Sequence, residues 1–473
     1  MIFSSLVFLF MFLPITLGIY YLVGNRFKNY VLLITSLIFY AWGEPIYVFL
    51  MIISIIFNYI FGIGVSTKNR KSVRKIWLII AIIFNIGLLF IFKYTGFILY
   101  NVDKVIKIGI TIPNIALPLG ISFFTFQSVS YVIDVYREDV PVQKKLTNIA
   151  LYISLFPQLV AGPIVRYQTV NEQISSRNHS IKKFGTGVNR FIVGLAKKVL
   201  ISNPLGFMAD QIFGTTLLSL STTTAWLGII AYGLQVYFDF SGYSDMAIGL
   251  GKMFGFDFLE NFNYPYISQS ASEFWRRWHI SLGSWFKDYV YIPLGGSRNG
   301  ILRTYLNLFA VWFLTGFWHG ASWTFIAWGL YYGIIISIEK SFLENILNNI
   351  LKPIRHIYLL TIVAIGWVFF RSESFSYAFN YIKSMFGMPQ SGIIYSETSL
   401  GYINDYGYLI IISIILATPM FKKIIKHIRS KNINILENGI IYFVEGSCIC
   451  AILLVITLQL VNSTYNPFLY FRF

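Results

Sequence analysis

The sequence predicts an all-α, polytopic membrane protein, and three observations support this fold class. The chain of 473 residues is 56% hydrophobic and only 12% charged, whereas soluble domains carry about 25% charged residues. Its apolar residues form long runs separated by short polar loops. Lys and Arg gather in several of these loops, as they do in the cytoplasmic loops of membrane proteins. This composition excludes soluble, disordered, collagen-like and disulfide-rich folds.

Apolar runs of about 20 residues are long enough to cross roughly 30 Å of hydrocarbon as helices. The strong candidates for membrane helices are residues 3–23, 47–65, 76–99, 115–136, 226–238, 308–338 with an internal break, 357–370, 409–420 and 440–461. Shorter or more polar candidates are residues 30–42, 149–160 and 191–213. We expect about eleven membrane helices with additional interfacial amphipathic helices, in one integral domain over residues 1–473.

Two clusters of basic residues fix the expected orientation in the membrane. Residues 68–75 and 422–431 each carry five Lys or Arg and are expected on the cytoplasmic side. Alternating crossings then place both termini outside, so that residues 462–473 form a short extracytoplasmic aromatic tail. This arrangement needs an even number of full crossings, so we expect at least one of the candidate segments to enter the bilayer without spanning it. The first apolar run has no Lys or Arg before it and no small-residue cleavage pattern after it, which favours an uncleaved span over a signal peptide.

Several other functions lack support in the sequence. The net charge of +17 suggests nucleic acid at first, but the basic residues lie between apolar runs and form no separate recognition helix. Cys448 and Cys450 lie in an apolar run and are interpreted as small buried residues rather than metal ligands. The absence of H-E-x-x-H, P-loop and G-x-S-x-G motifs argues against zinc hydrolysis, nucleotide hydrolysis and a nucleophile elbow.

His319 is the histidine with the strongest functional indication. It lies within the apolar run 308–338, and a helix that begins near Tyr305 would carry it about 21 Å into the bilayer. A titratable group at that depth is costly unless it faces a partner or a water-filled cavity. Catalysis or substrate binding, and an interhelical hydrogen bond worth about 1 kcal/mol, are the two open interpretations. The other histidines, His179, His356 and His427, lie in loops or at span edges and are expected to be solvated.

His279 lies in a segment whose pattern predicts an amphipathic interfacial helix over residues 270–289. Ser270 and Glu273 have the spacing of a capping box at its start. His279 falls on the aromatic stripe, and an interfacial anchor is the interpretation favoured by this helix alone. Asp239 and Asp245 follow an apolar run, and we expect them to cap a helix or bond to a neighbouring one.

Seven motifs in order along the chain resemble the membrane-bound O-acyltransferase (MBOAT) family, and within it the bacterial AlgI-, PatA- and DltB-like branch. They are residues 117–126 (LPLGISFFTF), 156–163 (FPQLVAGP), 237–245 (YFDFSGYSD), 275–279 (WRRWH), 291–296 (YIPLGG), 318–323 (WHGASW) and 367–371 (WVFFR). The resemblance implies a ring of membrane helices around a funnel in the bacterial cytoplasmic (inner) membrane.

The resemblance also implies an O-acyltransferase that modifies an extracytoplasmic polymer, with His319 as the catalytic histidine and His279 as the second family histidine. A neutral imidazole in an apolar funnel can take a proton from a hydroxyl, whose oxygen then attacks a thioester carbonyl. The candidates for substrate binding are Trp318, Trp323, Arg276 and Trp278, which lie near the two histidines in the sequence, and Asp245 in the motif 237–245. No metal and no tightly bound cofactor are expected.

The likeness is nearer to the AlgI and PatA types than to DltB, judged from residues 261–266 (NFNYPY) and 240–245 (FSGYSD), and this favours acetyl as the transferred group. Acetyl-CoA or an acyl-carrier thioester is then the expected donor. A secreted or membrane-anchored O-acetyltransferase is the expected partner. D-alanyl transfer to teichoic acid, a transporter or flippase for a lipid-linked sugar, and a non-catalytic scaffold remain the alternatives.

The last eight residues of this tail, 466–473 (NPFLYFRF), resemble the aromatic C-terminal motif of the small partner peptide in D-alanylation systems. This resemblance implies that Tyr470 accepts the acyl group at the funnel and passes it to an extracytoplasmic transferase. An aromatic anchor at the membrane interface is the other interpretation.

Overall fold

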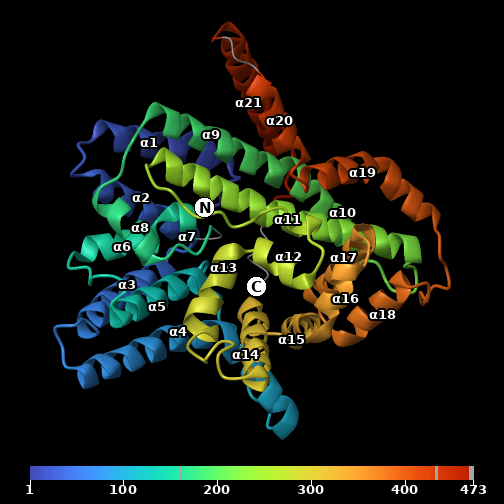
Figure 1. Cartoon of the computed structure of the whole chain (residues 1–473), viewed down its shortest axis with the longest axis horizontal. Coiled ribbons are helices and arrows are strands. Elements are labelled where there is room, and N and C mark those ends of the chain that lie inside the picture. Colours follow the sequence, from blue (N-terminus) through green and yellow to red (C-terminus); the bar gives the residue numbers. More distant parts are fainter. Residues whose placement is uncertain (160–161, 432–434, 468–473) are drawn as a thin grey trace. The chain divides into compact units, whose positions relative to one another are not determined.

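A computed structural model describes residues 1–159, 162–431 and 435–467 of the chain. All regular structure in these residues is helical, mostly α with short π and 3₁₀ segments (Figure 1). The predicted all-α fold is therefore confirmed.

The chain divides into two compact units. The first unit contains Met1–Phe191 and Tyr243–Leu259, and the second contains Ile192–Gly242 and Glu260–Phe473. Helices α9 (Ile181–Ala196) and α11 (Thr222–Met253) each have residues in both units. The single integral domain expected from the sequence stays a prediction.

The first unit is built around α5 (Ile121–Arg137), which is buried along almost its whole length. Helices α3 (Tyr47–Gly64) and α4 (Lys71–Ile106) lie beside it (Figure 1). Asn58 of α3 and Asn85 of α4 are buried and donate to each other's side-chain oxygens at 3.1 and 2.8 Å, so polar groups tie these helices together. The unit also contains η1 (Phe8–Phe12), α1 (Leu13–Leu22), α2 (Lys28–Gly43), α6 (Leu146–Ser154), α7 (Phe156–Leu159) and α8 (Tyr167–Ser175).

The second unit contains the two histidine motifs. Its elements are η2 (Lys197–Ser202), α10 (Asn203–Phe213), η3 (Pro265–Ile267), α12 (Ala271–Arg277), α13 (Ile280–Phe286), η4 (Lys287–Tyr291), α14 (Ile301–His319), α15 (Trp323–Ile338), η5 (Glu339–Leu343), α16 (Glu344–Asn349), α17 (Lys352–Arg371), α18 (Phe375–Met385), α19 (Glu397–Leu416), α20 (Met420–Lys431) and α21 (Ile435–Asn462). Serine caps begin α18 and α19, where the Ser374 and Ser396 side chains accept from backbone N–H groups.

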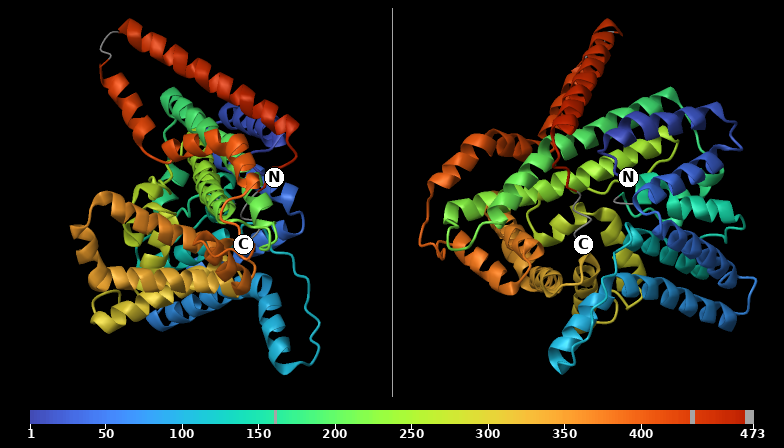
Figure 2. Two further views of the ribbon diagram at one scale, coloured as in Figure 1. Left: turned by 90° about the vertical axis from the view of Figure 1, so that its right-hand side faces the viewer. Right: turned by 180° about the vertical axis from the view of Figure 1, so that it is seen from behind.

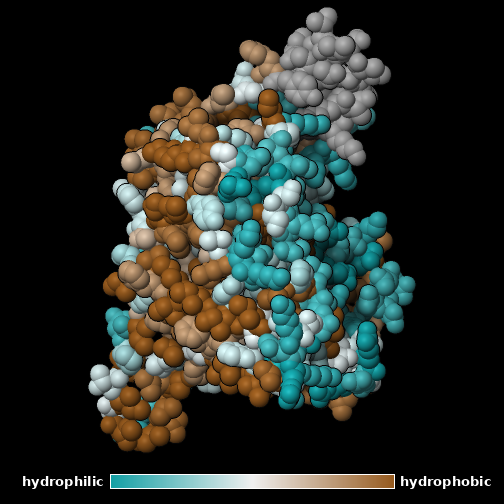
Figure 3. Space-filling view, turned by 90° about the vertical axis from the view of Figure 1, so that its left-hand side faces the viewer, coloured by the Kyte–Doolittle hydropathy of each residue, from teal (hydrophilic) through white to brown (hydrophobic). Residues whose placement is uncertain are grey.

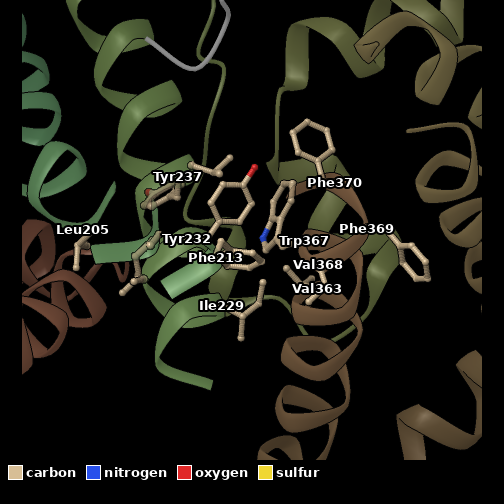
Figure 4. Close-up of a cluster of buried hydrophobic side chains, with 14 of the residues drawn as sticks. Leu205, Phe213, Ile229, Tyr232, Tyr237, Val363, Trp367, Val368, Phe369 and Phe370 are labelled. Atoms are coloured by element: carbon tan, nitrogen blue, oxygen red, sulfur yellow. The ribbon is translucent and has the colours of Figure 1, made fainter. Parts of the chain in front are cut away.

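The core of the second unit gathers aromatic side chains from α10, α11 and α17 (Figure 4). Trp367 of α17 donates through Nε1 to the Tyr266 hydroxyl at 3.1 Å, and Tyr266 donates to the Gly233 carbonyl at 2.6 Å. Phe369, two residues further along α17, points to the other side of that helix (Figure 4). Two sides of α17 therefore contact neighbouring residues, and these contacts fix the position of the helix end that carries Phe370.

Helices α14 and α15 form a close antiparallel pair, and the predicted break in the run 308–338 is confirmed at residues 320–322. The two helices approach closely at Gly316 and Gly329, because a Cβ placed on Gly329 would lie 2.9 Å from the Gly316 Cα. Small residues permit such an approach between membrane helices. The pair therefore holds His319, the last residue of α14, in a defined place.

Six helices in the described part of the chain are long and apolar enough to cross a membrane. They are Tyr47–Gly64, Lys71–Ile106, Ile181–Phe213, Lys352–Arg371, Glu397–Leu416 and Phe443–Asn462. The expected number of eleven is not confirmed, because other predicted spans correspond to shorter or more polar helices such as α5 and α11. Figure 3 shows a broad apolar area beside a hydrophilic one, as expected for a surface that partly faces lipid.

Two sequence predictions are wrong in the second unit. Residues 270–289 do not form one helix, because the chain breaks at Trp278 and His279 between α12 and α13. Cys448 and Cys450 are exposed rather than buried. They lie on α21, which projects from the rest of its unit (Figure 2), and few of the residues in Phe443–Asn462 are buried.

Candidate functional site

His319 ends α14 and lies among aromatic rings of three helices. Its ring centroid is 4.8 Å from that of Trp318, 4.9 Å from that of Trp328 and 5.1 Å from that of Phe370. Trp328 is completely buried, whereas His319 itself is only half-buried. The imidazole is thus held in place by packing, and the neighbouring residues do not seal it off from solvent.

A cavity of about 590 Å³ lies next to this aromatic cluster. Its lining combines rings with hydroxyl and charged groups: Tyr232, Ser322, Thr324, Phe325, Phe370, Arg371, Ser372 and Glu373. Phe370 contacts both His319 and Phe325, with ring centroids 5.1 and 4.9 Å apart. The cavity is adjacent to the imidazole, because the Phe370 ring lines the cavity and also contacts His319. Its size and mixed lining suit a small ligand with both polar and apolar parts.

His279 is the residue at which α12 and α13 meet. Its backbone is left-handed, with φ 45° and ψ 54°, a conformation that non-glycine residues seldom adopt outside constrained sites. Asn261 holds the turn, because its side-chain oxygen accepts from the Ser281 N–H at 3.1 Å and from the Ser281 hydroxyl at 2.9 Å. Its backbone carbonyl accepts from the Ile280 N–H at 2.9 Å. A continuous helix is replaced by a turn that directs His279 inward.

The His279 side chain is 6% exposed and lies outside the six candidate spans. Burial lowers the pKa of His279 to about 4, so its imidazole is neutral at physiological pH. Its ring centroid is 6.4 Å from that of Trp318, which in turn contacts His319. The two histidines that are 40 positions apart in the sequence are therefore linked through one indole.

Glu339 is a buried carboxylate that the sequence analysis did not identify. It is 2% exposed, and its oxygens accept from the Ala271 N–H at 2.6 Å, the Ser272 N–H at 2.8 Å and the Ser272 hydroxyl at 2.7 Å. These groups form the N-terminus of α12, where free N–H groups favour a negative charge. Glu339 follows directly on α15, so it ties the helix before His279 to the helix after His319. In the sequence it stands beside Lys340 at the end of an apolar run and resembles a solvated residue.

The predicted substrate-binding residues have different surroundings. Trp318 is buried between the two histidines, and Trp278 is buried against Phe274 and Trp367. Trp323 and Arg276 are exposed. Tyr470 lies outside the residues that the structure describes.

Asp239 and Asp245 lie inside α11, so they do not cap a helix. Each pairs with a basic residue of a neighbouring helix. Asp245 lies in the first unit, where Arg190 contacts it at 2.7 Å. Asp239 lies in the second unit, where Lys198 contacts it at 2.5 Å. The expected bonding to a neighbouring helix is confirmed for both. No cluster of three or more potential metal ligands occurs among the described residues.

In a helix interior, glycine is less stable than alanine. At position 279 we expect the reverse, with His279→Gly more stable than His279→Ala. Glycine adopts a left-handed backbone without strain, so His279→Gly should be about 1 kcal/mol more stable than His279→Ala. Thermal unfolding in detergent would measure this difference, with Ser284→Gly and Ser284→Ala in α13 as the control pair. A more stable alanine variant at position 279 would contradict the observed break between α12 and α13.

The chain is similar to several known membrane acyltransferases. The sequence model of the membrane-bound O-acyltransferase (MBOAT) family matches residues 140–379 of the chain. The chain is 45% identical over 391 residues to the probable alginate O-acetylase AlgI of Pseudomonas aeruginosa, covering 82% of this chain and 75% of that protein. It is 33% identical over 517 residues to the peptidoglycan O-acetyltransferase of Helicobacter pylori, covering 100% and 98%. The teichoic acid D-alanyltransferase of Streptococcus thermophilus is 31% identical over 248 residues, covering 48% and 58%.

Proposed function

The chain belongs to the membrane-bound O-acyltransferase family and is a multi-pass O-acyltransferase, and we propose that it moves acetyl groups from a cytoplasmic thioester for O-acetylation of an extracytoplasmic polysaccharide. Relatives that align with 82% and 100% of this chain are named for O-acetylation of alginate and of peptidoglycan. The observation that carries the proposal is the half-buried His319 ring beside a polar-lined cavity of about 590 Å³.

We assign His319 as the general base. An acceptor hydroxyl gives its proton to the imidazole while its oxygen attacks the thioester carbonyl carbon. The new C–O bond forms, the C–S bond breaks, and the leaving thiolate takes the proton from the imidazolium. His279, held neutral by burial, supports the site through Trp318. Trp318 and the ring of Trp278 shape the site, while Trp323 and Arg276 stay candidates for substrate contacts.

The proposal places both termini outside the bacterial cytoplasmic membrane, with the basic clusters on the cytoplasmic side where the donor is made. Acetyl-CoA or an acyl-carrier thioester is the donor, and a secreted or membrane-anchored O-acetyltransferase is the partner. Tyr470 in the aromatic tail is then the first acceptor: its phenol oxygen receives the acetyl group and passes it to the partner.

The choice of donor tests the proposal directly. Purified protein is incubated in vesicles with [¹⁴C]acetyl-CoA, with an acetyl-carrier thioester or with a D-alanyl-carrier thioester, and release of free thiol is measured. We expect consumption of an acetyl thioester. Consumption of the D-alanyl thioester alone would assign the chain to D-alanylation instead. If the protein consumed no thioester but moved a lipid-linked sugar across the vesicle, it would be a transporter.

Tyr470→Phe keeps the aromatic ring and removes the acceptor oxygen. We expect this substitution to reduce polymer acetylation in cells by at least tenfold while the protein level stays unchanged, because the acetyl group has no carrier. Polymer acetylation is measured by mild alkaline release of acetate, with Tyr408→Phe on exposed α19 as the control. Unchanged acetylation in Tyr470→Phe would reject the shuttle and favour an interfacial anchor.

A further inference from the structure

Three successive tail residues are bound by side chains from η2 and α10. The Tyr465 hydroxyl donates to Asp210 Oδ2 at 2.7 Å, and Asn203 Nδ2 donates to Asn466 Oδ1 at 3.2 Å. Lys198 Nζ donates to the Pro467 carbonyl. As the tail advances from 465 to 467, its partners move back from 210 to 198. Residues 465–467 therefore run antiparallel to η2 and α10, all within the second unit.

The partners in η2 and α10 are spaced to face one side. Lys198 and Asn203 are five residues apart across the π-helical segment Lys197–Ser202, and a π-helix repeats its hydrogen bonds every five residues. Asn203 and Asp210 are seven residues apart, about two turns of an α-helix. The local π-helix thus brings the lysine, the amide and the carboxylate into one row.

Lys198 anchors the row in the interior. Lys198 and Asp239 are each 2% exposed, and their charges neutralise each other at 2.5 Å. An ammonium group has three N–H donors, so after one pairs with Asp239 another can bind the tail carbonyl. Proline has no backbone N–H, so the half-buried Pro467 brings an acceptor to the Lys198 ammonium without adding a backbone donor of its own. The sequence of the tail fits the position that it occupies.

Asp210 links the tail to the wall of the reaction cavity. Its Oδ2 accepts from Tyr465, and its Oδ1 accepts from Arg371 Nη2 at 2.8 Å. Arg371 lines the cavity of about 590 Å³ and follows Phe370, whose ring contacts His319. One carboxylate thus touches both the tail and the residue next to the aromatic wall of the site.

We propose that Lys198, Asn203 and Asp210 form a peptide-binding row that positions residues 465–467 of the C-terminal tail beside the reaction cavity. Residues 465–467 are the segment that this row binds, and Asp210 and Tyr465 are positioning residues rather than catalytic ones. The inference rests on the proposed function in one respect: the tail serves acyl transfer. A tail that served only as an interfacial anchor would have no need of a bond to a carboxylate or of an approach to a buried ion pair.

Tyr465→Phe and Asp210→Asn test the row, because both keep the size of the side chain. Tyr408→Phe is the control, since Tyr408 is 65% exposed on α19. Hydrogen–deuterium exchange of the peptide 463–473 is followed without any substrate, and acetyl transfer is measured separately as kcat and KM. We expect this peptide to exchange about tenfold faster in both test variants, and kcat to fall at least tenfold. The KM for the thioester and the unfolding midpoint should stay close to those of the control.

The outcomes separate the row from the proposed function. Unchanged exchange in both variants would show that the row does not hold the tail. Faster exchange with unchanged kcat would show that the tail is held but that its position does not serve transfer. If the wild-type protein consumed no acyl thioester, the proposed function would fail, while the exchange measurement would still decide whether the row binds the tail.

Discussion

Replacing His319 with alanine is expected to reduce acyl transfer by a factor of about 10² to 10⁴, the usual contribution of a general base. Without the imidazole, no group in the aromatic cluster of Trp318, Trp328 and Phe370 accepts a proton from the attacking hydroxyl. The loss should appear in kcat, because the cavity that we assign to substrate is lined by other residues. Turnover of a labelled acetyl thioester measures the effect.

Two matched variants make this result specific. His319→Gln keeps a polar side chain of similar length but supplies no base, so it should be as inactive as the alanine variant. His427→Ala removes an exposed histidine outside the cluster and should keep full activity. Because His319 is half-buried, all three proteins should unfold at similar temperatures. Activity within threefold of wild type in His319→Gln would end the assignment of this residue as the base.

The parts of the fold that the sequence predicts well depend on long apolar runs. The helix over residues 47–65 is found as Tyr47–Gly64, and the break within 308–338 is found beside Gly320. The same pattern identifies His319 as a candidate site residue, because a histidine inside an apolar run is costly unless it has a polar partner or faces a cavity. These features are local, so periodicity and cost of burial are sufficient to find them.

The parts that the sequence does not predict depend on contacts between distant segments. The pattern over residues 270–289 favours one helix, but Asn261 binds the backbone and side chain of Ser281 and stabilises a left-handed His279. Glu339 is separated from its partners Ala271 and Ser272 by more than sixty residues, so no local pattern reveals it. Cys448 and Cys450 looked buried because apolar composition does not distinguish packing against protein from exposure to lipid.

Glu339→Ala is expected to destabilise the protein by about 3 kcal/mol, because it leaves the buried N–H groups of Ala271 and Ser272 without an acceptor. The loss of negative charge at the start of α12 adds to this effect. Tyr358, whose hydroxyl lies 3.2 Å from Glu339 Oε1, would lose a partner as well. Thermal and denaturant unfolding in detergent would measure the change.

The same substitution should affect catalysis, since α12 carries the aromatic residues that lead to His279. In Glu339→Gln one amide oxygen remains as an acceptor, while the amide NH₂ replaces the second one and faces a backbone N–H. We therefore expect intermediate stability and a lower kcat at temperatures where the protein stays folded. Glu344→Gln, on the exposed side of α16, is the matched control and should behave as wild type. Equal stability of Glu339→Ala and Glu344→Ala would mean that α12 is held by its aromatic packing alone, with Trp275 against Trp328 and Tyr332 as its main support.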